Sequence, residues 1–186
     1  MYGGANGEKD RIRKEIRQVS TNLDPAYRAK ASRSIARQVT ALPEWQRAKT
    51  VMAYVSMAEE PDTKELIDAA LAEGKTLLLP RCADRSVMEA LPVTDLNALV
   101  PGKLGIPEPP AAEGKDAPEP EVILVPCVAA TMNGIRLGHG AGYYDRFLAG
   151  HRGMTVCLCF HPLLRADLPA EATDVPVDMV ITDEGD

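Results

Sequence analysis

The sequence predicts a single α/β domain of three layers, in which helices cover both faces of a mostly parallel sheet. Segments with helical spacing of apolar residues alternate with short strands along the chain. The strands, such as residues 122–125, are continuously apolar, as expected when both faces of a sheet are buried. The chain has 186 residues and 45% hydrophobic content, which suffices for one sizeable core but not for two domains of ordinary size.

The N-terminal part predicts a tail followed by a basic helix. Residues 1–7 are rich in glycine and small side chains, so we expect a disordered tail, with residues 8–186 forming the one domain. Between residues 8 and 19, isoleucine and valine recur at helical spacing among lysines and arginines, which predicts an amphipathic helix with a basic outer face. From the residues alone, this face is either solvated or a binding surface.

A second helix and the first two strands follow. Asp24 and Pro25 are suited to the N-cap and first turn of a helix that ends before Pro43. Residues 50–55 are apolar and β-branched, which predicts a strand. The spacing of Asp62 and Glu65 resembles a capping box that opens a helix ending at Gly74, before a buried strand over residues 76–79.

The remaining elements continue the alternation. Proline, alanine and glutamate dominate residues 107–120, which predicts a surface loop. A short helix is expected over residues 143–148, ending at Gly150. Further strands are expected over residues 87–93, 122–125, 155–159 and 179–182.

Composition narrows the possible partners and location. The net charge of −6 opposes nucleic acid over long range, so we expect no nucleic-acid partner. No apolar run reaches the roughly 18 to 20 residues of a membrane-spanning helix, and the first residues lack the apolar stretch of a secretory signal. We therefore expect a cytoplasmic protein without a membrane partner. The four cysteines lack the paired spacing of a zinc site and are expected to be reduced thiols.

The glycine-rich segment Gly134–Leu148 is the most informative part of the chain. Four glycines, at positions 134, 138, 140 and 142, lead directly into the short helix. Successive backbone N–H groups and the start of the helix can therefore converge on an anion such as the phosphates of ATP. Arg136 is suited to phosphate oxygens, and Asp145 offers a carboxylate to magnesium. Alternatively, the glycines only make a tight turn and Asp145 caps the helix.

The same segment carries a family resemblance. Its pattern, G-x-R-L-G-x-G-x-G-Y-Y-D-x-x-L, resembles the signature of the 5-formyltetrahydrofolate cyclo-ligases. Other pieces match in order: a lysine and an arginine four residues apart in the first helix, the turn at residues 56–63, and residues 105–109. The resemblance covers the chain from about Lys9 to Asp183.

The resemblance implies binding sites for ATP and the folate. Lys9 and Arg13 would reach the nucleotide phosphates, which favours a binding role for the basic helix face. The expected ATP-binding loop consists of Arg136, Leu137, Gly138, His139, Gly140, Ala141, Gly142, Tyr143 and Tyr144. The folate would contact Val55 and Glu60, whose carboxylate accepts hydrogen bonds from the pterin, and also His139, Gly140, Ala141, Gly142 and Tyr143.

It also implies a magnesium cofactor and catalytic residues. Asp145 and Asp174 resemble the family's metal carboxylates, with Asp178 as the alternative to Asp174 if the register differs. Tyr143 and Arg136 are the residues expected to act in catalysis. In some relatives arginine and lysine replace His139 and Ala141, and the missing charge is expected to affect phosphate affinity.

The reaction that the resemblance implies is ATP-dependent closure of 5-formyltetrahydrofolate to 5,10-methenyltetrahydrofolate, with release of ADP and phosphate. Phosphorylation of the formyl oxygen would give an iminium phosphate, which the second folate nitrogen attacks. The alternative is a homologue that binds folate or nucleotide without catalysis. We expect only small-molecule partners and a monomer.

Overall fold

The computed structural model describes residues 5–84, 86–102, 105–111 and 117–184. Its helices are α1 (Ala5–Thr21), α2 (Pro25–Ala41), α3 (Pro43–Arg47), α4 (Lys64–Ala72) and α5 (Tyr143–Leu148). A six-stranded sheet contains β1 (Thr50–Met52), β2 (Thr76–Cys82), β3 (Met88–Val93), β6 (Val122–Val125), β9 (Met154–Leu158) and β10 (Met179–Ile181). Two small hairpins are formed by β4 (Val100–Pro101) with β5 (Pro107–Glu108) and by β7 (Ala129–Ala130) with β8 (Arg136–Leu137).

The main sheet has the order β10-β9-β6-β1-β2-β3. All neighbouring strands pair in parallel except β2 and β3, which form an antiparallel pair at one edge. The central strands β1 and β6 are buried along their whole length. The prediction of a single α/β domain with a mostly parallel sheet is therefore confirmed.

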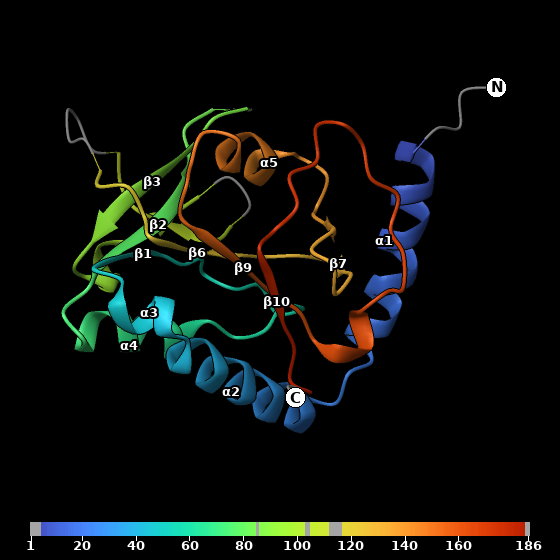
Figure 1. Cartoon of the computed structure of the whole chain (residues 1–186), viewed down its shortest axis with the longest axis horizontal. Helices are drawn as coiled ribbons and strands as arrows, with labels where there is room; N and C mark the ends of the chain where they lie inside the picture. Colours follow the sequence, from blue (N-terminus) through green and yellow to red (C-terminus); the bar gives the residue numbers. More distant parts are fainter. Residues whose placement is uncertain (1–4, 85, 103–104, 112–116, 185–186) are drawn as a thin grey trace.

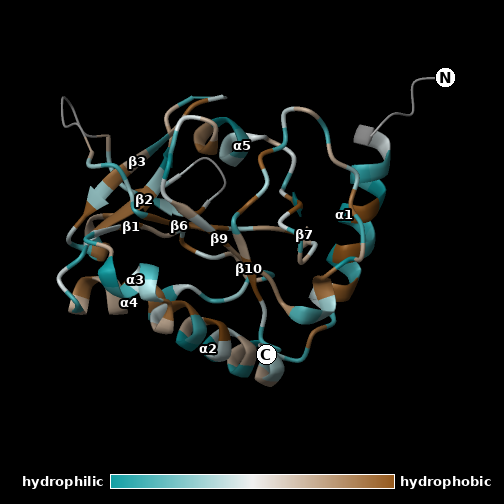
Figure 2. Ribbon diagram, in the orientation of Figure 1, coloured by the Kyte–Doolittle hydropathy of each residue, from teal (hydrophilic) through white to brown (hydrophobic). Residues whose placement is uncertain are grey.

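Helices lie on both sides of this sheet. In Figure 1, α2, α3 and α4 lie below it, α5 lies above it, and α1 stands at one end. Apolar side chains from the strands and from α2, among them Ile35 and Val39, form a continuous core in which Trp45 is fully buried. Figure 2 shows the resulting division, with hydrophobic residues along the strands and hydrophilic residues on the outer turns of the helices.

Several boundaries differ from the sequence-based expectation. Helix α1 begins at Ala5, so residues 5–7, assigned to a disordered tail, are helical, and that prediction was wrong for them. A glycine lowers helix propensity without forbidding a helix. Residues 1–4 of the expected tail lie outside the described residues, as do residues 112–116 of the expected loop.

Strand β1 ends at Met52, three residues earlier than expected. The N–H of Ala53 still donates to Leu78, but the chain then leaves the sheet. Tyr54 and Val55 consequently lie beyond the strand end and line a cavity. The hairpin of β7 and β8 was not predicted.

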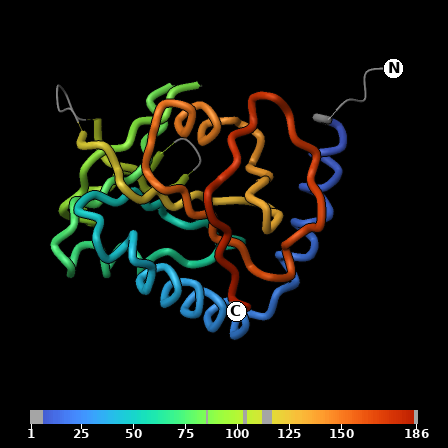
Figure 3. Tube along the Cα trace, viewed as in Figure 1, coloured from blue at the N-terminus to red at the C-terminus, as the bar shows by residue number. Residues whose placement is uncertain are grey.

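The topology places this strand end at a switch point. From β1 the chain proceeds outward through β2 and β3, and it later returns to the other side of β1 through β6. Ligands of parallel α/β sheets bind at the carboxyl ends of the strands where the strand order reverses in this way. Figure 3 shows that α1 and the C-terminal connection, residues 164–178 before β10, run side by side near this edge. Among the described residues, no helix is both long and apolar enough to cross a bilayer.

Candidate active site

A cavity of about 450 Å³ opens at the carboxyl edge of the sheet. The segments after β1 and β6, the ends of β2 and β3 that face this edge, and the turn before α5 line it. All the residues that the sequence assigned to ATP, folate or metal also lie in its wall: Lys9, Arg13, Val55, Glu60, Asp174 and every residue from Arg136 to Asp145. The fold thus brings together residues from four separate parts of the chain, while their individual roles stay predictions.

Helix α1 contributes two cations from one face. Lys9 is 6% exposed, and its Nζ atom lies 2.8 Å from Oε2 of Glu171 and 2.7 Å from Oδ2 of Asp174. One turn later, Nε of Arg13 donates to the carbonyl of Gly138 at 2.8 Å. The basic residues of α1 therefore have two different environments. Lys9 and Arg13 line the cavity, whereas Arg11 is exposed to solvent.

Arg136 is held beneath the glycine-rich turn. Its Nη2 atom donates to Oδ1 of Asp145 at 2.9 Å, and its side chain is 3% exposed. Its Nε atom is buried without a hydrogen-bond partner among the described residues. Oδ1 of Asp145 also accepts from the N–H of Val175 at 3.0 Å. Asp145 therefore holds Arg136 and the C-terminal connection, and it forms no cap of α5.

The glycines of the turn serve two different purposes. Gly134 has a φ of 93°, and a β-carbon there would lie 2.4 Å from the carbonyl of Val177, so this glycine allows two backbones to approach closely. Gly140 and Gly142 have φ values of 105° and 67° and line the cavity. Of the described residues in the cavity wall, only these two have the left-handed conformation, because Gly138 lacks it.

Tyr143, expected to be catalytic, is tied to the β2–β3 turn. Its hydroxyl donates to the carbonyl of Asp84 at 2.8 Å. The guanidinium of Arg146 lies 5.5 Å from the centre of the Tyr143 ring and donates to the carbonyl of Ser86 at 2.7 Å. These contacts join α5 to the β2–β3 turn beside the cavity.

Glu60 and His139 meet across the cavity. Nε2 of His139 lies 3.0 Å from Oε1 of Glu60, and Oε2 of Glu60 accepts from the N–H of Met57 at 2.8 Å. Glu60 is 7% exposed, so its carboxylate is a buried acceptor rather than a surface charge. His139 is therefore engaged with the carboxylate expected to bind the pterin.

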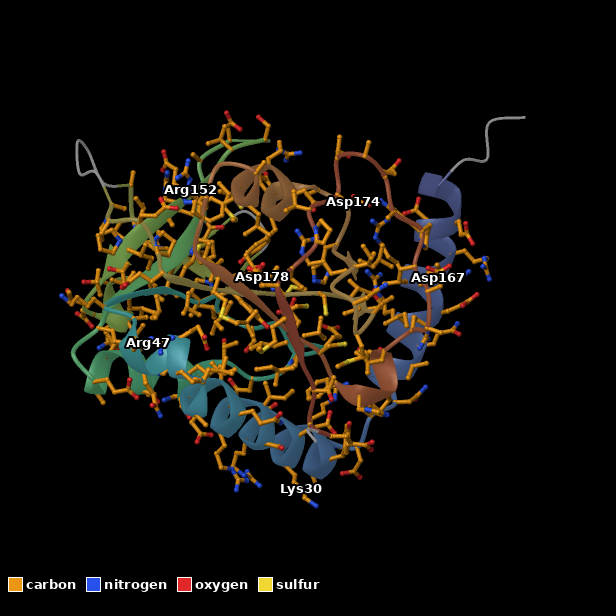
Figure 4. All side chains as sticks on the ribbon, viewed as in Figure 1. Lys30, Arg47, Arg152, Asp167, Asp174 and Asp178 are labelled. Carbon is orange, nitrogen blue, oxygen red and sulfur yellow. The ribbon has the colours of Figure 1, made fainter. Side chains whose placement is uncertain are left out.

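The expected metal ligands are neighbours in the cavity wall. Among the residues that the structure describes, Asp174 accepts from Lys9 through Oδ2 and Asp145 accepts from Arg136 through Oδ1, which leaves the second oxygen of each carboxylate for a ligand. Asp178 instead accepts from the N–H and the hydroxyl of Thr155, both at 2.8 Å, and does not line the cavity. Figure 4 shows Asp174 on the connection near α1 and Asp178 farther along, by β10.

Two carboxylates fit magnesium when phosphates complete its coordination, because this ion commonly binds one or two carboxylates together with phosphate oxygens. The described residues contain no cluster of three or more acidic, histidine or cysteine side chains arranged for a metal. The donor set therefore suits an ion that arrives with a nucleotide, and it does not form a complete protein cage.

Sequence reasoning missed several residues of the wall. Glu171 pairs with Lys9, Arg146 fastens α5, and Tyr54 places a buried hydroxyl in the cavity. The position of Tyr54 immediately before Val55, at the end of a strand, was a usable signal because strand ends of parallel sheets carry ligand contacts. Glu171 and Arg146 had no comparable signal.

Comparisons with known proteins agree with this geometry. The family model described as "5-formyltetrahydrofolate cyclo-ligase family" matches residues 5–183. A probable 5-formyltetrahydrofolate cyclo-ligase of Schizosaccharomyces pombe is 35% identical, over 81% of this chain and 83% of its own. The 5-formyltetrahydrofolate cyclo-ligase of Saccharomyces cerevisiae is 30% identical, over 95% and 96%.

A solved structure extends the agreement to the fold. The NMR structure of the 5,10-methenyltetrahydrofolate synthetase of Aquifex aeolicus superposes with a TM-score of 0.84 at 32% identity, covering 95% of this chain and 90% of that one. The synthetase of Mycoplasma pneumoniae, 20% identical with a TM-score of 0.73, shares the fold. With a family match over nearly its whole length and a cavity that gathers the signature residues, the chain belongs to the 5-formyltetrahydrofolate cyclo-ligase family.

Proposed function

We propose that this chain is a ligase that converts 5-formyltetrahydrofolate and ATP to 5,10-methenyltetrahydrofolate, ADP and phosphate. One observation carries the proposal: the glycine-rich turn, the two cations of α1, Glu60 and the two aspartates all line a single cavity. The family membership supports the same reaction.

The folate is assigned to the part of the cavity near Glu60. A buried carboxylate can accept hydrogen bonds from the N–H groups of the pterin, and Val55 beside it offers an apolar surface. On the other side, the turn from His139 to Tyr143 would border the bound folate. Because His139 contacts Oε1 of Glu60, a pterin that bonds to this oxygen would compete with His139 for it.

ATP is assigned to the turn itself. The backbone from Arg136 to Tyr144 would surround the phosphates, with Lys9 and Arg13 approaching from α1. The unpartnered Nε of Arg136 supports this assignment, because a buried guanidinium nitrogen without an acceptor is expected to bind one from a ligand.

The charges of the cavity support a magnesium cofactor. Among the described residues, four cations and five carboxylates line the wall, namely Lys9, Arg13, Arg136 and Arg146 against Glu60, Glu108, Asp145, Glu171 and Asp174. A triphosphate entering this nearly neutral cavity needs additional positive charge. Asp145 and Asp174 would hold the ion, which supplies that charge to the phosphate oxygens.

The residues then act mainly by position and charge. The γ-phosphoryl group passes to the formyl oxygen, ADP departs, and the resulting iminium phosphate carries a carbon that the second folate nitrogen attacks. The bond to the phosphorylated oxygen then breaks, phosphate leaves and the attacking nitrogen loses its proton. Arg136, Lys9 and the turn N–H groups would stabilise the charge on the transferred group, and Tyr143, fixed by Asp84, would border the reacting formyl group.

The near-ultraviolet absorbance of the methenyl product tests this function directly. Protein mixed with ATP, magnesium and 5-formyltetrahydrofolate is expected to develop that absorbance together with one ADP per product. Folate binding without product would favour the alternative, a non-catalytic homologue, for which the loss of charge at His139 and Ala141 is the supporting observation.

A pair of matched variants tests the role of Arg136. Arg136→Lys keeps the charge but removes the Nε donor, and loss of one charged hydrogen bond worth about 1.5–3 kcal/mol should lower kcat roughly 10- to 100-fold. Arg81→Lys makes the same exchange on β2, outside the cavity wall, and should leave kcat unchanged. Equal activities of the two variants would remove Arg136 from the site.

Assembly and location remain predictions. We expect a monomer that acts in the cytoplasm on small molecules without a nucleic-acid or membrane partner. Size-exclusion chromatography with light scattering would test the first expectation, and fractionation of cells would test the second. A relative in Arabidopsis thaliana is described as mitochondrial.

A further inference from the structure

Two buried tyrosine hydroxyls in the cavity have no hydrogen-bond partner in the part of the chain that the structure describes. Among the described residues, five buried side-chain nitrogen or oxygen atoms lack a partner, and the Oη atoms of Tyr54 and Tyr144 are two of them. Both residues line the same cavity. Buried polar groups in folded proteins are nearly always satisfied, so an exception at a binding site indicates a group that a ligand completes.

The two hydroxyls come from distant parts of the chain. Tyr54 follows β1 and is 3% exposed, whereas Tyr144 lies in the first turn of α5. Burial is the main cause that raises the pKa of each hydroxyl, and the carboxylate of Glu60 is the next cause for both. Both tyrosines therefore stay protonated at physiological pH, and both lie near Glu60 without bonding to it.

Together these three side chains present a defined pattern. The Glu60 carboxylate only accepts hydrogen bonds, and each neutral tyrosine hydroxyl has a proton to donate. The cavity thus offers a buried acceptor accompanied by two unused donors. One edge of a pterin has the complementary pattern, because its N3–H and 2-amino donors lie between two acceptors, the 4-oxo oxygen and N1.

We propose that the hydroxyls of Tyr54 and Tyr144 position the folate by donating to the 4-oxo oxygen and N1, on either side of the N–H groups bound by Glu60. This inference rests on the proposed folate site at Glu60. It also separates two roles of Tyr144, whose backbone belongs to the nucleotide turn while its hydroxyl serves the pterin.

The pattern gives the site a means of selecting its substrate. A buried site built to complete hydrogen bonds rejects molecules that leave its donors unpaired. The two tyrosines therefore add a requirement for acceptors beside the N–H edge, which a carboxylate alone cannot impose. They also hold the pterin in one orientation, as in-line transfer to the formyl oxygen demands.

Phenylalanine variants provide the test, because they remove only the hydroxyls. Tyr54→Phe and Tyr144→Phe are each expected to raise the KM for 5-formyltetrahydrofolate about five- to tenfold, as for loss of one buried hydrogen bond, and to leave the KM for ATP unchanged. Because no described residue bonds to these hydroxyls, neither variant should lower Tm.

Tyr27→Phe is the matched control. Its hydroxyl donates to Oδ2 of Asp183 at 2.7 Å, away from the cavity, so this variant should lower Tm without changing either KM. If Tyr54→Phe and Tyr144→Phe lowered Tm in the same way and left the folate KM unchanged, the hydroxyls would be structural and the inference would be wrong. A rise confined to the KM for ATP would also contradict it.

Glu60→Gln separates this inference from the folate site on which it rests. The amide keeps the size of the side chain but replaces an acceptor by a donor, so the folate KM should rise. If it rose while both phenylalanine variants kept the wild-type KM, only the role of the tyrosines would be refuted. An unchanged folate KM in Glu60→Gln would overturn the placement of the pterin itself.

Discussion

Replacing Lys9 by methionine isolates the ion pairs that join α1 to the C-terminal connection. The exchange keeps an unbranched side chain and removes the ammonium that lies 2.8 Å from Glu171 and 2.7 Å from Asp174. The side chain of Lys9 is 7% exposed, that of Asp174 20% and that of Glu171 37%. Breaking a fully buried pair costs about 3–5 kcal/mol. Because water reaches both carboxylates, we expect the free energy of unfolding to fall by about 2–3 kcal/mol.

The pH dependence of this loss follows from the two partners. Burial alone would lower the pKa of Lys9, but its hydrogen bonds with Asp174 and Glu171 outweigh burial and raise the pKa above 10.5. Burial alone would raise the pKa of Asp174, but hydrogen bonds from Lys9 and from the N–H of Glu171 hold it below 3.8. The contribution of Lys9 is thus lost as pH rises through its raised pKa, and that of Asp174 as pH falls through its lowered pKa. The difference between wild type and Lys9→Met should be constant from about pH 5 to 9.

Urea unfolding followed by circular dichroism measures both effects, with Arg11→Met as the control. Arg11 lies on the same helix, its side chain is 64% exposed, and it pairs with Glu15 at 2.8 Å. An exposed pair of this kind contributes about 0.5 kcal/mol or less. If the two variants lost the same free energy, the ion pairs of Lys9 would not stabilise the contact between α1 and the connection.

Three further substitutions probe the turn and the aspartates. Asp145→Ala should lower kcat at least about tenfold while changing folate affinity less than threefold, because its carboxylate serves the phosphate rather than the pterin; equal losses in kinetics and in folate titration would contradict this. Gly142→Ala should lower the free energy of unfolding by about 1–2 kcal/mol, because φ is 67° and the new β-carbon would lie 2.8 Å from Nη1 of Arg146. Gly150→Ala, at a glycine without positive φ, is the control in the same denaturation experiment. Ala141→Lys adds a cation to the turn, so it should lower the KM for ATP about three- to tenfold and leave the folate KM unchanged. Initial rates at varied ATP measure this effect, and an unaltered KM for ATP would mean that the turn lies away from the phosphates.

Much of the fold follows from local patterns in the sequence. Continuous apolar runs such as residues 122–125 predicted buried parallel strands, and Asp24 caps α2 by accepting from the N–H groups of Ala26 and Tyr27, as its position before a proline indicated. The hairpin of β7 and β8 escaped prediction because strands of two residues are too short for any periodicity. The end of β1 was placed too late because apolar residues continue past the sheet into the cavity.

The site was predictable where a motif specifies it and not where packing decides. The residues of the glycine-tyrosine signature from Arg136 to Asp145 line one cavity, while their roles stay predictions. The helical pattern alone could not separate Lys9 from Arg11, and only the family resemblance singled out Lys9. The partners of Lys9, Glu171 and Asp174, become known only from the fold. Likewise, an unsatisfied hydroxyl such as that of Tyr54 becomes visible only when its surroundings are known.

A crystal structure with 5-formyltetrahydrofolate, magnesium and a non-hydrolysable ATP analogue would test the central claim most directly. We expect the γ-phosphate to lie against the backbone of residues 138–142 and the guanidinium of Arg136, with the pterin edge at Glu60 and the formyl oxygen facing the phosphate. A triphosphate bound outside this cavity, or a pterin far from Glu60, would contradict the account.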